Sequence, residues 1–441
     1  MSPSEKTPDS TLPLDFNRRD FLRGGSLATL MMLMGGAEIT AQTTDKTLPP
    51  PKADPNFKEK PPAPPVNFGV IGAGAWGREI LSTLARQSNA PVAAVCDNYA
   101  SSLRRAAELA PKAEKYADYH QLLDSKDVQA VVVSTPSHEH KEIALAALQA
   151  GKHVCCEAPL ASTIEDARVI ARAAKAAGKQ IFQTGLNYRA NPQHHHVLQF
   201  IRTGAMGKPV FARAQWHNKL SWRKASPNPA REKALNWRLD PEMSSGLMGE
   251  IGIHQVDVAS WFFAGLPHSV TGFGGIIAWN DGRAVPDTIQ AVFEYADGVK
   301  FAYDATLANS FDSTFDMFYG TDSAIIVRVN RAWMFKEADS PLLGWEVYAR
   351  KDEILGETGI ALVANATKLL ALGKKPAEAA ADSDTPLYYA FEEFIRNIDE
   401  KKAPSAGYRE GFESVVTAVK ANESILSGQK IIYQKEWFEV G

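Results

Sequence analysis

The chain has 441 residues, of which 45% are hydrophobic and 22% charged, a globular composition long enough for two domains plus appendages. Its 48 Lys and Arg nearly balance 51 Asp and Glu, and the net charge of −3 gives no electrostatic basis for binding nucleic acid or for a polybasic membrane contact. Three cysteines, two of them adjacent, exclude a disulfide framework.

Residues 1–41 have the features of a twin-arginine export signal. The pair Arg18-Arg19 precedes an apolar stretch rich in small residues, Gly24 to Ala37. This stretch is too short and too glycine-rich to span a bilayer as a stable helix. We therefore expect the twin-arginine export machinery to be a partner, and the protein to be periplasmic or otherwise extracytoplasmic. Cleavage after Ala41 and retention by an uncleaved N-terminal segment both stay open.

Residues 42–65 are predicted to be a linker. Eight prolines lie between residues 42 and 66. Such a segment favours extended polyproline conformations and cannot bury a core. We therefore expect the first domain to start at residue 66.

A glycine-rich turn follows the first predicted strand, Val66 to Ile71. It reads Gly-Ala-Gly-Ala-Trp-Gly over residues 72–77, and a helix and a second strand ending at Asp97 come after it. In this order, the glycines permit a tight turn and a close approach of the backbone to a pyrophosphate. The acidic residue twenty positions after the last glycine would hydrogen-bond the adenosine ribose. The segment therefore predicts a dinucleotide-binding domain.

Asp97 also bears on the choice of dinucleotide. Its carboxylate would repel a 2′-phosphate, and Asn98 and Tyr99, which follow it, supply no compensating arginine. Arg104 and Arg105 lie a turn or two further on and could still reach. The pattern favours NAD over NADP.

The alternation of strands and helices continues to about residue 187. Buried strands are predicted at Val128–Ser134, Lys152–Cys156 and Gln180–Thr184, with helices between them. This pattern predicts a doubly wound parallel sheet, a Rossmann domain over residues 66–187. Ligands bind at the carboxyl ends of such strands. The cofactor-binding candidates are Gly72, Gly74, Ala75, Trp76, Gly77, Asp97, Asn98, Ser134, Thr135, Pro136, His140, Glu157, Ala158 and Pro159.

Residues 188–441 are predicted to form a second α/β domain with a large, mostly antiparallel open sheet. Longer strands rich in β-branched and aromatic residues, separated by Asp/Gly turns, indicate this architecture. A helix running to about Phe263 carries Glu250, His254 and Asp257 at i, i+4 and i+7, on one face. Two carboxylates and an imidazole in one stripe could polarise and deprotonate a hydroxyl. These three residues are the catalytic candidates.

Further polar and aromatic residues suggest a carbohydrate site. Clusters at residues 217–223 and 236–238 could stack on a sugar ring and hydrogen-bond to it, although ordinary loop packing stays open. The substrate-binding candidates are Tyr188, Arg189, Lys219, Trp222, Arg223 and Trp237. The consecutive histidines 194–196 would point about 100° apart on a helix, so no metal site is expected.

From residue 66 to about residue 435 the chain resembles the Gfo/Idh/MocA oxidoreductase family. The resemblance rests on the glycine turn with Asp97 and on several further motifs, which occur in the family's order and at about its spacing. These motifs are Ser134-Thr135-Pro136 with His138 and His140, Gly151-Lys152-His153-Val154, Glu157-x-Pro159, Gly204-Ala205-Met206-Gly207-Lys208 and the stretch from Glu250 to Asp257.

The resemblance implies a Rossmann domain plus an open-sheet α/β domain, NAD(P) as hydride carrier, and sugars or cyclitols as usual substrates. It implies that His254 is the general base, that Glu250 orients the substrate or tunes the histidine, and that Asp257 contacts the substrate. Association of family members through the open sheet implies a homo-oligomer. Exported members of the family include enzymes that hold their cofactor tightly, in agreement with the export signal.

One residue departs from the family pattern. The Glu-Lys-Pro motif reads Glu157-Ala158-Pro159, and an alanine can neither donate a proton nor stabilise an alkoxide. Tyr188, Lys219 and Arg223 are the possible substitutes. Three hypotheses follow: an exported sugar, glycoside or polyol oxidoreductase with tightly bound NAD(H), a redox-neutral NAD-dependent glycosidase that oxidises, eliminates and reduces again, and a non-catalytic sugar-binding relative.

Overall fold

The computed structural model describes residues 61–343, 346, 349–354, 356–364, 372 and 384–441. The predicted export signal, residues 1–41, and most of the predicted linker lie outside these described residues. The last linker residues pack on the first domain, because Ala63 is buried and its carbonyl accepts a hydrogen bond from the Asn89 side chain at 3.0 Å. Ordered packing therefore extends a few residues before the predicted start at residue 66.

The first domain is built on a six-stranded parallel sheet with the order β3-β2-β1-β4-β5-β6. Its strands are β1 (Phe68–Ile71), β2 (Val92–Cys96), β3 (Glu114–Tyr116), β4 (Ala130–Val133), β5 (His153–Cys156) and β6 (Phe182–Thr184). Its helices are α3 (Ala75–Ala85), α4 (Ala100–Leu109), α5 (Tyr119–Asp124), α6 (His140–Gln149) and α7 (Ile164–Ala177). The strand order reverses between β1 and β4, so the ligand crevice of this fold lies at the carboxyl ends of these two strands.

The second sheet has ten strands in the order β14-β15-β13-β12-β11-β7-β10-β9-β8-β16. Only the β7–β10 pair is parallel among the described strand pairs of this sheet. The strands are β7 (Pro209–His217), β8 (Ser269–Gly275), β9 (Thr288–Glu294), β10 (Lys300–Thr306), β11 (Thr314–Gly320), β12 (Ser323–Arg328), β13 (Arg331–Lys336), β14 (Lys351–Ile354), β15 (Glu357–Leu362) and β16 (Ile431–Ile432).

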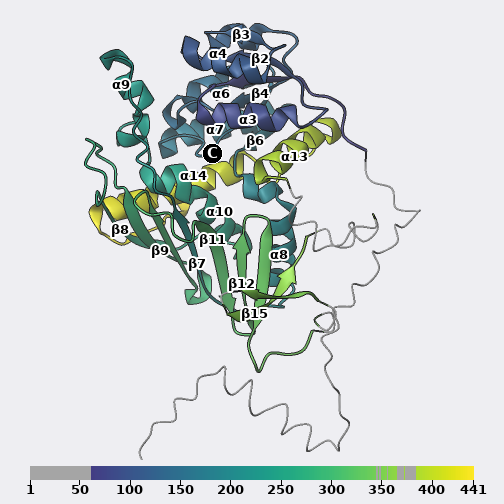
Figure 1. Cartoon of the computed structure of the whole chain (residues 1–441), viewed down its shortest axis with the longest axis vertical. Helices are drawn as coiled ribbons and strands as arrows, with labels where there is room; N and C mark the ends of the chain where they lie inside the picture. Colours follow the sequence, from purple (N-terminus) through teal and green to yellow (C-terminus); the bar gives the residue numbers. More distant parts are fainter. Residues whose placement is uncertain (1–60, 344–345, 347–348, 355, 365–371, 373–383) are drawn as a thin grey trace, which may run out of the picture. The chain divides into compact units, whose positions relative to one another are not determined.

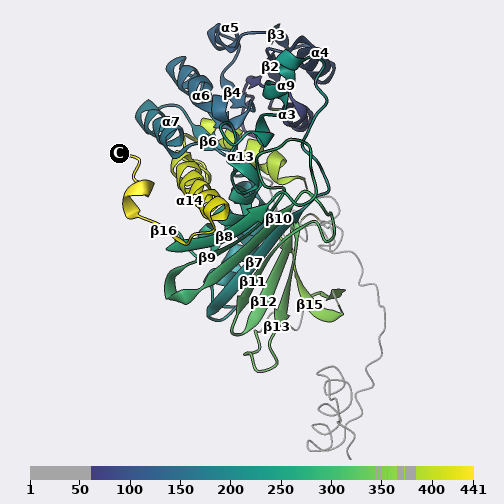
Figure 2. The ribbon, with the colours of Figure 1, turned by 90° about the vertical axis from the view of Figure 1, so that its left-hand side faces the viewer.

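Helices cover one face of this second sheet, whereas no described helix is drawn on the other face (Figure 2). The covering helices are α8 (Pro192–Arg202), α10 (Ile253–Phe262) and α14 (Tyr408–Ser427). Strand residues alternate accordingly, since Phe301 and Tyr303 of β10 are buried towards the helices and Lys300 and Ala302 are exposed. The predicted fold, a Rossmann sheet plus a large open and mostly antiparallel sheet, is confirmed.

Two C-terminal helices join the domains (Figure 1). Helix α13 (Pro386–Glu400) has apolar residues at i, i+4 and i+7, and it buries them on the Rossmann sheet. The ring centroids of Phe391 and Phe68 of β1 lie 6.0 Å apart in an edge-on contact. Helix α14 begins beside β6, where the Thr184 hydroxyl donates to the Gly407 carbonyl at 2.9 Å. Helix α13 belongs to the predicted second domain (residues 188–441), but it packs against the sheet of the first domain.

Candidate active site

The glycine turn between β1 and α3 is closed on one side and open on the other. A Cβ on Gly77 would lie 1.9 Å from the Gly72 carbonyl oxygen, so only glycine permits α3 to pack this closely on the turn. A Cβ on Gly74, by contrast, would meet nothing within 4 Å. Ala75 and Trp76 beside it are exposed at the start of the helix. Free backbone N–H groups at an open helix start suit a phosphate group, so the turn fits a dinucleotide.

Asp97 lies directly after β2 and organises the same turn. Its two carboxylate oxygens accept hydrogen bonds from the Ala73 and Tyr99 backbone N–H groups, each at 2.8 Å. A carboxylate can accept about four hydrogen bonds, so Asp97 keeps capacity for ribose hydroxyls. Its neighbour Asn98 is exposed.

The loops after β4 and β5 complete the carboxyl edge of the sheet. Ser134, Thr135 and Pro136 are half-buried there, and the Ser134 hydroxyl donates to the Gly72 carbonyl at 2.7 Å. Glu157 is buried after β5, and burial raises its pKa to about 7, while a hydrogen bond from the Trp76 side chain acts in the opposite direction. The half-buried Ala158 follows it and offers no functional group.

His140, a predicted cofactor-binding residue, packs between the loops after β4 and β5. Its side chain is buried, with Nε2 at 2.9 Å from the Thr135 carbonyl oxygen and Nδ1 at 3.0 Å from that of Pro159. Burial lowers its pKa to about 4, so the ring is neutral at pH 7. Both ring nitrogens face the loops after β4 and β5, and the single N–H of the neutral ring donates to one of the two carbonyl oxygens.

Glu250 connects the second domain to this edge. It lies in a π-helical segment, Met248–Gly252, which runs into α10, and such segments frequently occur at functional sites. One carboxylate oxygen accepts from the Ser137 hydroxyl at 2.9 Å and from the Ser244 hydroxyl at 3.2 Å. The other lies 4.0 Å from Nε of Arg238. Burial raises the pKa of Glu250, and the Arg238 charge opposes this rise.

His254 follows one turn later on α10 and is half-buried. Tyr188, on the 3-10 turn Asn187–Ala190, meets it edge-on at a centroid distance of 6.3 Å. The other side of the Tyr188 ring stacks on His194 at 4.6 Å. Burial lowers the pKa of His254, against the charge of Asp257, which raises it. A neutral imidazole beside a phenol can accept a proton from a bound hydroxyl.

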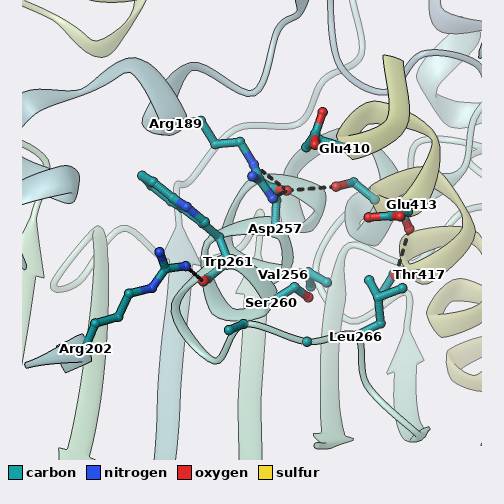
Figure 3. Close-up of a pocket in the computed structure, with 13 residues that line it drawn as sticks. Arg189, Arg202, Val256, Asp257, Ser260, Trp261, Leu266, Glu410, Glu413 and Thr417 are labelled. Carbon is teal, nitrogen blue, oxygen red and sulfur yellow. Dashed lines mark hydrogen bonds and ion pairs between the residues drawn. The ribbon is translucent and has the colours of Figure 1, made fainter. Parts of the chain in front are cut away.

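Asp257 lies three residues after His254 on α10 and has polar partners of its own. Its buried carboxylate forms a bidentate ion pair with Arg189, whose Nε lies 2.8 Å and Nη2 2.9 Å from its oxygens, and it accepts from the Ser414 hydroxyl at 3.0 Å. These groups line a cavity of about 300 Å³ between α10 and α14, in which Trp261 lies beside Arg189 (Figure 3). The π-helical segment Met248–Gly252 lies before His254, so it changes the position of Glu250 relative to His254 and Asp257.

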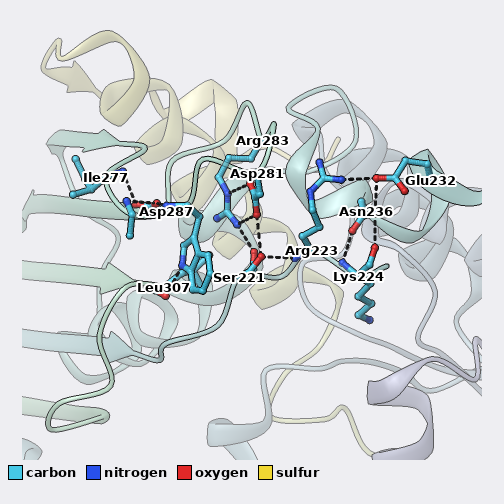
Figure 4. Close-up of polar contacts among 12 residues, drawn as sticks. Ser221, Arg223, Lys224, Glu232, Asn236, Ile277, Asp281, Arg283, Asp287 and Leu307 are labelled. Carbon is cyan, nitrogen blue, oxygen red and sulfur yellow. Dashed lines mark hydrogen bonds and ion pairs between the residues drawn. The ribbon is translucent and has the colours of Figure 1, made fainter. Parts of the chain in front are cut away.

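The other predicted substrate residues separate into two groups. Lys219 is exposed, and the exposed Arg223 is ion-paired with Glu232 (Figure 4). Trp222 and Trp237, however, both contact Arg238, whose guanidinium carbon lies 5.9 Å and 4.4 Å from the centroids of their rings. The two tryptophans therefore lie near Glu250, whereas Lys219 and Arg223 have no contact that connects them to it among the described residues.

Three residues of the site were not predicted from the sequence: Ser137, Ser244 and Arg238. The polar and aromatic cluster at residues 236–238 pointed to Arg238. Its pairing with Glu250 could not be predicted, because the two residues lie on separate segments. The histidines at 194–196 have separate surroundings, with His194 buried, His195 against Trp261 and His196 against Phe200. A search of the described residues shows no group of three His, Cys, Asp or Glu side chains able to hold a metal ion.

Sequence comparisons identify relatives of both domains. The model of the oxidoreductase family with an NAD-binding Rossmann fold matches residues 66–185, and that of the GFO/IDH/MocA C-terminal domain matches residues 194–326. Inositol 2-dehydrogenase of Salmonella paratyphi B is 31% identical over 195 residues, 44% of this chain and 53% of the relative. Levoglucosan dehydrogenase of Pseudarthrobacter phenanthrenivorans is 29% identical over 241 residues, 49% and 59% of the two chains. The chain thus spans about half the length of these curated relatives.

Solved structures share the fold. A levoglucosan dehydrogenase in complex with NADH and L-sorbose superposes with a TM-score of 0.68 at 21% identity, covering 84% of this chain and 99% of the other. Myo-inositol 2-dehydrogenase from Lactobacillus plantarum gives a TM-score of 0.63 at 18% identity, covering 84% and 100%. The two family models together match more than half of the sequence, and the chain belongs to the Gfo/Idh/MocA oxidoreductase family.

Proposed function

We propose that the protein is an NAD(H)-dependent oxidoreductase that acts on a hydroxyl group of a sugar, glycoside or related polyol. The observation that carries this proposal is the position of a half-buried, neutral His254 beside Tyr188, on the domain that Glu250 links to Ser137 in the loop after β4. Relatives named inositol 2-dehydrogenase and levoglucosan dehydrogenase support the substrate class. Asp97 at the end of β2 supports NAD over NADP.

Each residue has a proposed role that follows from the position and chemistry of its side chain. The nicotinamide ring of the bound cofactor accepts or returns the hydride. His254 takes the proton of the reacting hydroxyl and returns it in the reverse direction. Glu250, held by two serine hydroxyls and Arg238, orients a neighbouring hydroxyl. The half-buried Trp222 offers apolar surface for a sugar ring, and the buried Trp237 packs beside it against Arg238.

Tyr188 is the proposed substitute for the family lysine that Ala158 replaces. Among the three candidates, only Tyr188 contacts His254 within the described part of the chain. We expect Tyr188→Phe to lower kcat by about tenfold to a hundredfold, because the hydroxyl is lost while the ring and its stacking on His194 remain. Steady-state kinetics with Tyr119→Phe as the control checks this. Equal kcat values for both variants would exclude Tyr188 from proton transfer.

The first experiment uses protein purified without added nucleotide. Its reduced-nicotinamide absorbance is recorded before and after addition of single free sugars, cyclitols and aryl glycosides. A band that rises or falls with one sugar supports the oxidoreductase. Aglycone release at constant absorbance supports instead the redox-neutral glycosidase, which the missing lysine at Ala158 favours as the second candidate. Sugar binding without either change supports a non-catalytic protein.

We also propose that the protein is exported by the twin-arginine route with its cofactor already bound. The support is the arginine pair at residues 18 and 19 before an apolar stretch. Among the described residues, no helix combines the length and apolarity needed to cross a bilayer. Replacing both arginines by lysine should retain the protein in the cytoplasm, as cell fractionation would show. Unchanged fractionation would contradict the proposed route.

The open sheet face is proposed as a homo-oligomer interface. Phe211 and Tyr319 stack there with ring centroids 4.0 Å apart, and Phe273 and Val292 remain 62% and 46% exposed. Exposed apolar side chains gathered on one face favour association. Light scattering is expected to show a dimer or larger assembly that Phe211→Glu weakens. Leu426→Glu, on α14, makes the same change away from this face and should have no effect. A monomeric wild-type protein would contradict the proposal.

A further inference from the structure

A segment of the second domain reaches the nucleotide side of the first. Residues 218–244, here called the α9 segment, leave β7 and include the short helix α9 (Pro229–Leu235). The guanidinium carbon of Arg231 lies 3.7 Å from the ring centroid of Tyr99, at the start of α4. Tyr99 in turn donates its backbone N–H to Asp97. The α9 segment is therefore attached next to the carboxylate expected at the ribose.

Lys224 has a fixed backbone within this segment. The Asn236 side chain accepts a hydrogen bond from its backbone N–H at 2.7 Å and donates one to its carbonyl at 3.0 Å. Figure 4 shows the lysine side chain extending away from this pair of bonds. No hydrogen bond or ion pair of the Lys224 ammonium is found among the described residues. The side chain is exposed, so its ammonium is accessible to a ligand while its backbone is held in place.

The charges around Lys224 are positive. Partial desolvation lowers the pKa of the exposed Lys224, and the charges of Arg238, Arg78 and Arg105 lower it further. Arg78 lies in the first turn of α3, directly after the glycine turn, and its guanidinium donates to the Ala73 carbonyl at 3.1 Å. Arg238 is near the Glu250 carboxylate, but no carboxylate pairs with Lys224 within the described residues. The like charges of Lys224, Arg78 and Arg105 repel one another, and a bound anion relieves that repulsion.

We propose that Lys224 is a cofactor-binding residue contributed by the second domain, which contacts the diphosphate of the dinucleotide, and that the Arg231–Tyr99 contact holds the α9 segment over the bound nucleotide. This inference rests on the proposed NAD(H) function. We assign the anion as the diphosphate because Arg78, whose charge acts on Lys224, directly follows the open turn at Gly74. A phosphate at the ribose is disfavoured by the Asp97 carboxylate. The arrangement gives a structural basis for a tightly held cofactor.

Equilibrium titration of NADH and of NADPH, without substrate, tests the lysine. We expect Lys224→Gln to raise the Kd for NADH about tenfold or more and to reduce its dependence on salt, since a charge-assisted contact is lost. Lys233→Gln is the matched control, because this lysine lies in the same segment and pairs with Asp240 at 3.2 Å. Equal Kd values for the two variants overturn the inference. A loss of affinity for NADPH alone, with an unchanged Kd for NADH, overturns the assignment to the diphosphate.

A second variant tests the attachment of the α9 segment. Arg231→Ala is expected to speed NADH dissociation in stopped-flow measurements, with little change in thermal unfolding of the nucleotide-free protein. An unchanged dissociation rate overturns this part of the inference. The failure of the wild-type protein to bind either nucleotide would instead overturn the proposed function itself. The two failures are therefore distinguishable.

Discussion

His254→Ala is expected to lower kcat by about a hundredfold or more and to leave the Kd for NADH unchanged. The substitution removes the only proposed group that accepts the hydroxyl proton, and general-base catalysis contributes about this much. The nucleotide contacts lie elsewhere, on the glycine turn, Asp97 and the loops after β4 and β5. Steady-state kinetics on the substrate that the sugar panel identifies, with NADH titration of the same samples, checks both parts.

The pH profile gives an independent test of this role. Burial lowers the pKa of His254 below its ordinary value of 6.5, so the ring loses its proton at lower pH than an exposed histidine does. Activity needs the neutral ring for oxidation, and the acid limb of kcat/KM should therefore lie below pH 6.5 and vanish in His254→Ala. His120→Ala, an exposed histidine on α5, is the control. A full-rate His254→Ala enzyme would remove the assignment.

Arg189→Met is expected to destabilise the protein by about 3 kcal/mol, because it leaves the Asp257 carboxylate buried without its partner. The two side chains are only 14% and 3% exposed, and they share a bidentate contact. Urea unfolding at pH 7, followed by circular dichroism, measures the change. The methionine keeps most of the apolar volume beside Trp261, so the loss reports on the charge.

Arg202→Met is the matched control for this prediction. Arg202 lines the same cavity, but it is exposed and makes one hydrogen bond, to the Trp261 carbonyl at 3.3 Å. We expect a change within about 0.5 kcal/mol, as is usual for surface substitutions. A double variant, Arg189→Met with Asp257→Leu, should recover part of the stability, because no unpaired charge is then buried. Equal losses of stability in Arg189→Met and Arg202→Met would contradict the proposed cost of leaving the Asp257 carboxylate without its partner.

The two sheets and the glycine turn can be predicted from the amino-acid sequence alone. Their signals are local: apolar runs such as β4, alternation along β10, and glycines between a strand and a helix. Glycine at position 77 is required because its own turn leaves no room for a Cβ. The pairing of His254 with Tyr188 could not be derived, although each residue was a candidate, because they are brought together by packing of separate elements.

Which polar groups form hydrogen bonds and ion pairs depends on how the elements pack in three dimensions. The stripe of Glu250, His254 and Asp257 followed from helical periodicity, but the pairing of Asp257 with Arg189 did not, because Arg189 lies on another element. Ser137 is 113 positions from Glu250, and no local pattern encodes their hydrogen bond. In the same way, Arg231 reaches Tyr99 because two domains dock. Periodicity specifies which face of an element is buried, whereas a buried charge selects its partner from whatever the docked elements bring within hydrogen-bond distance.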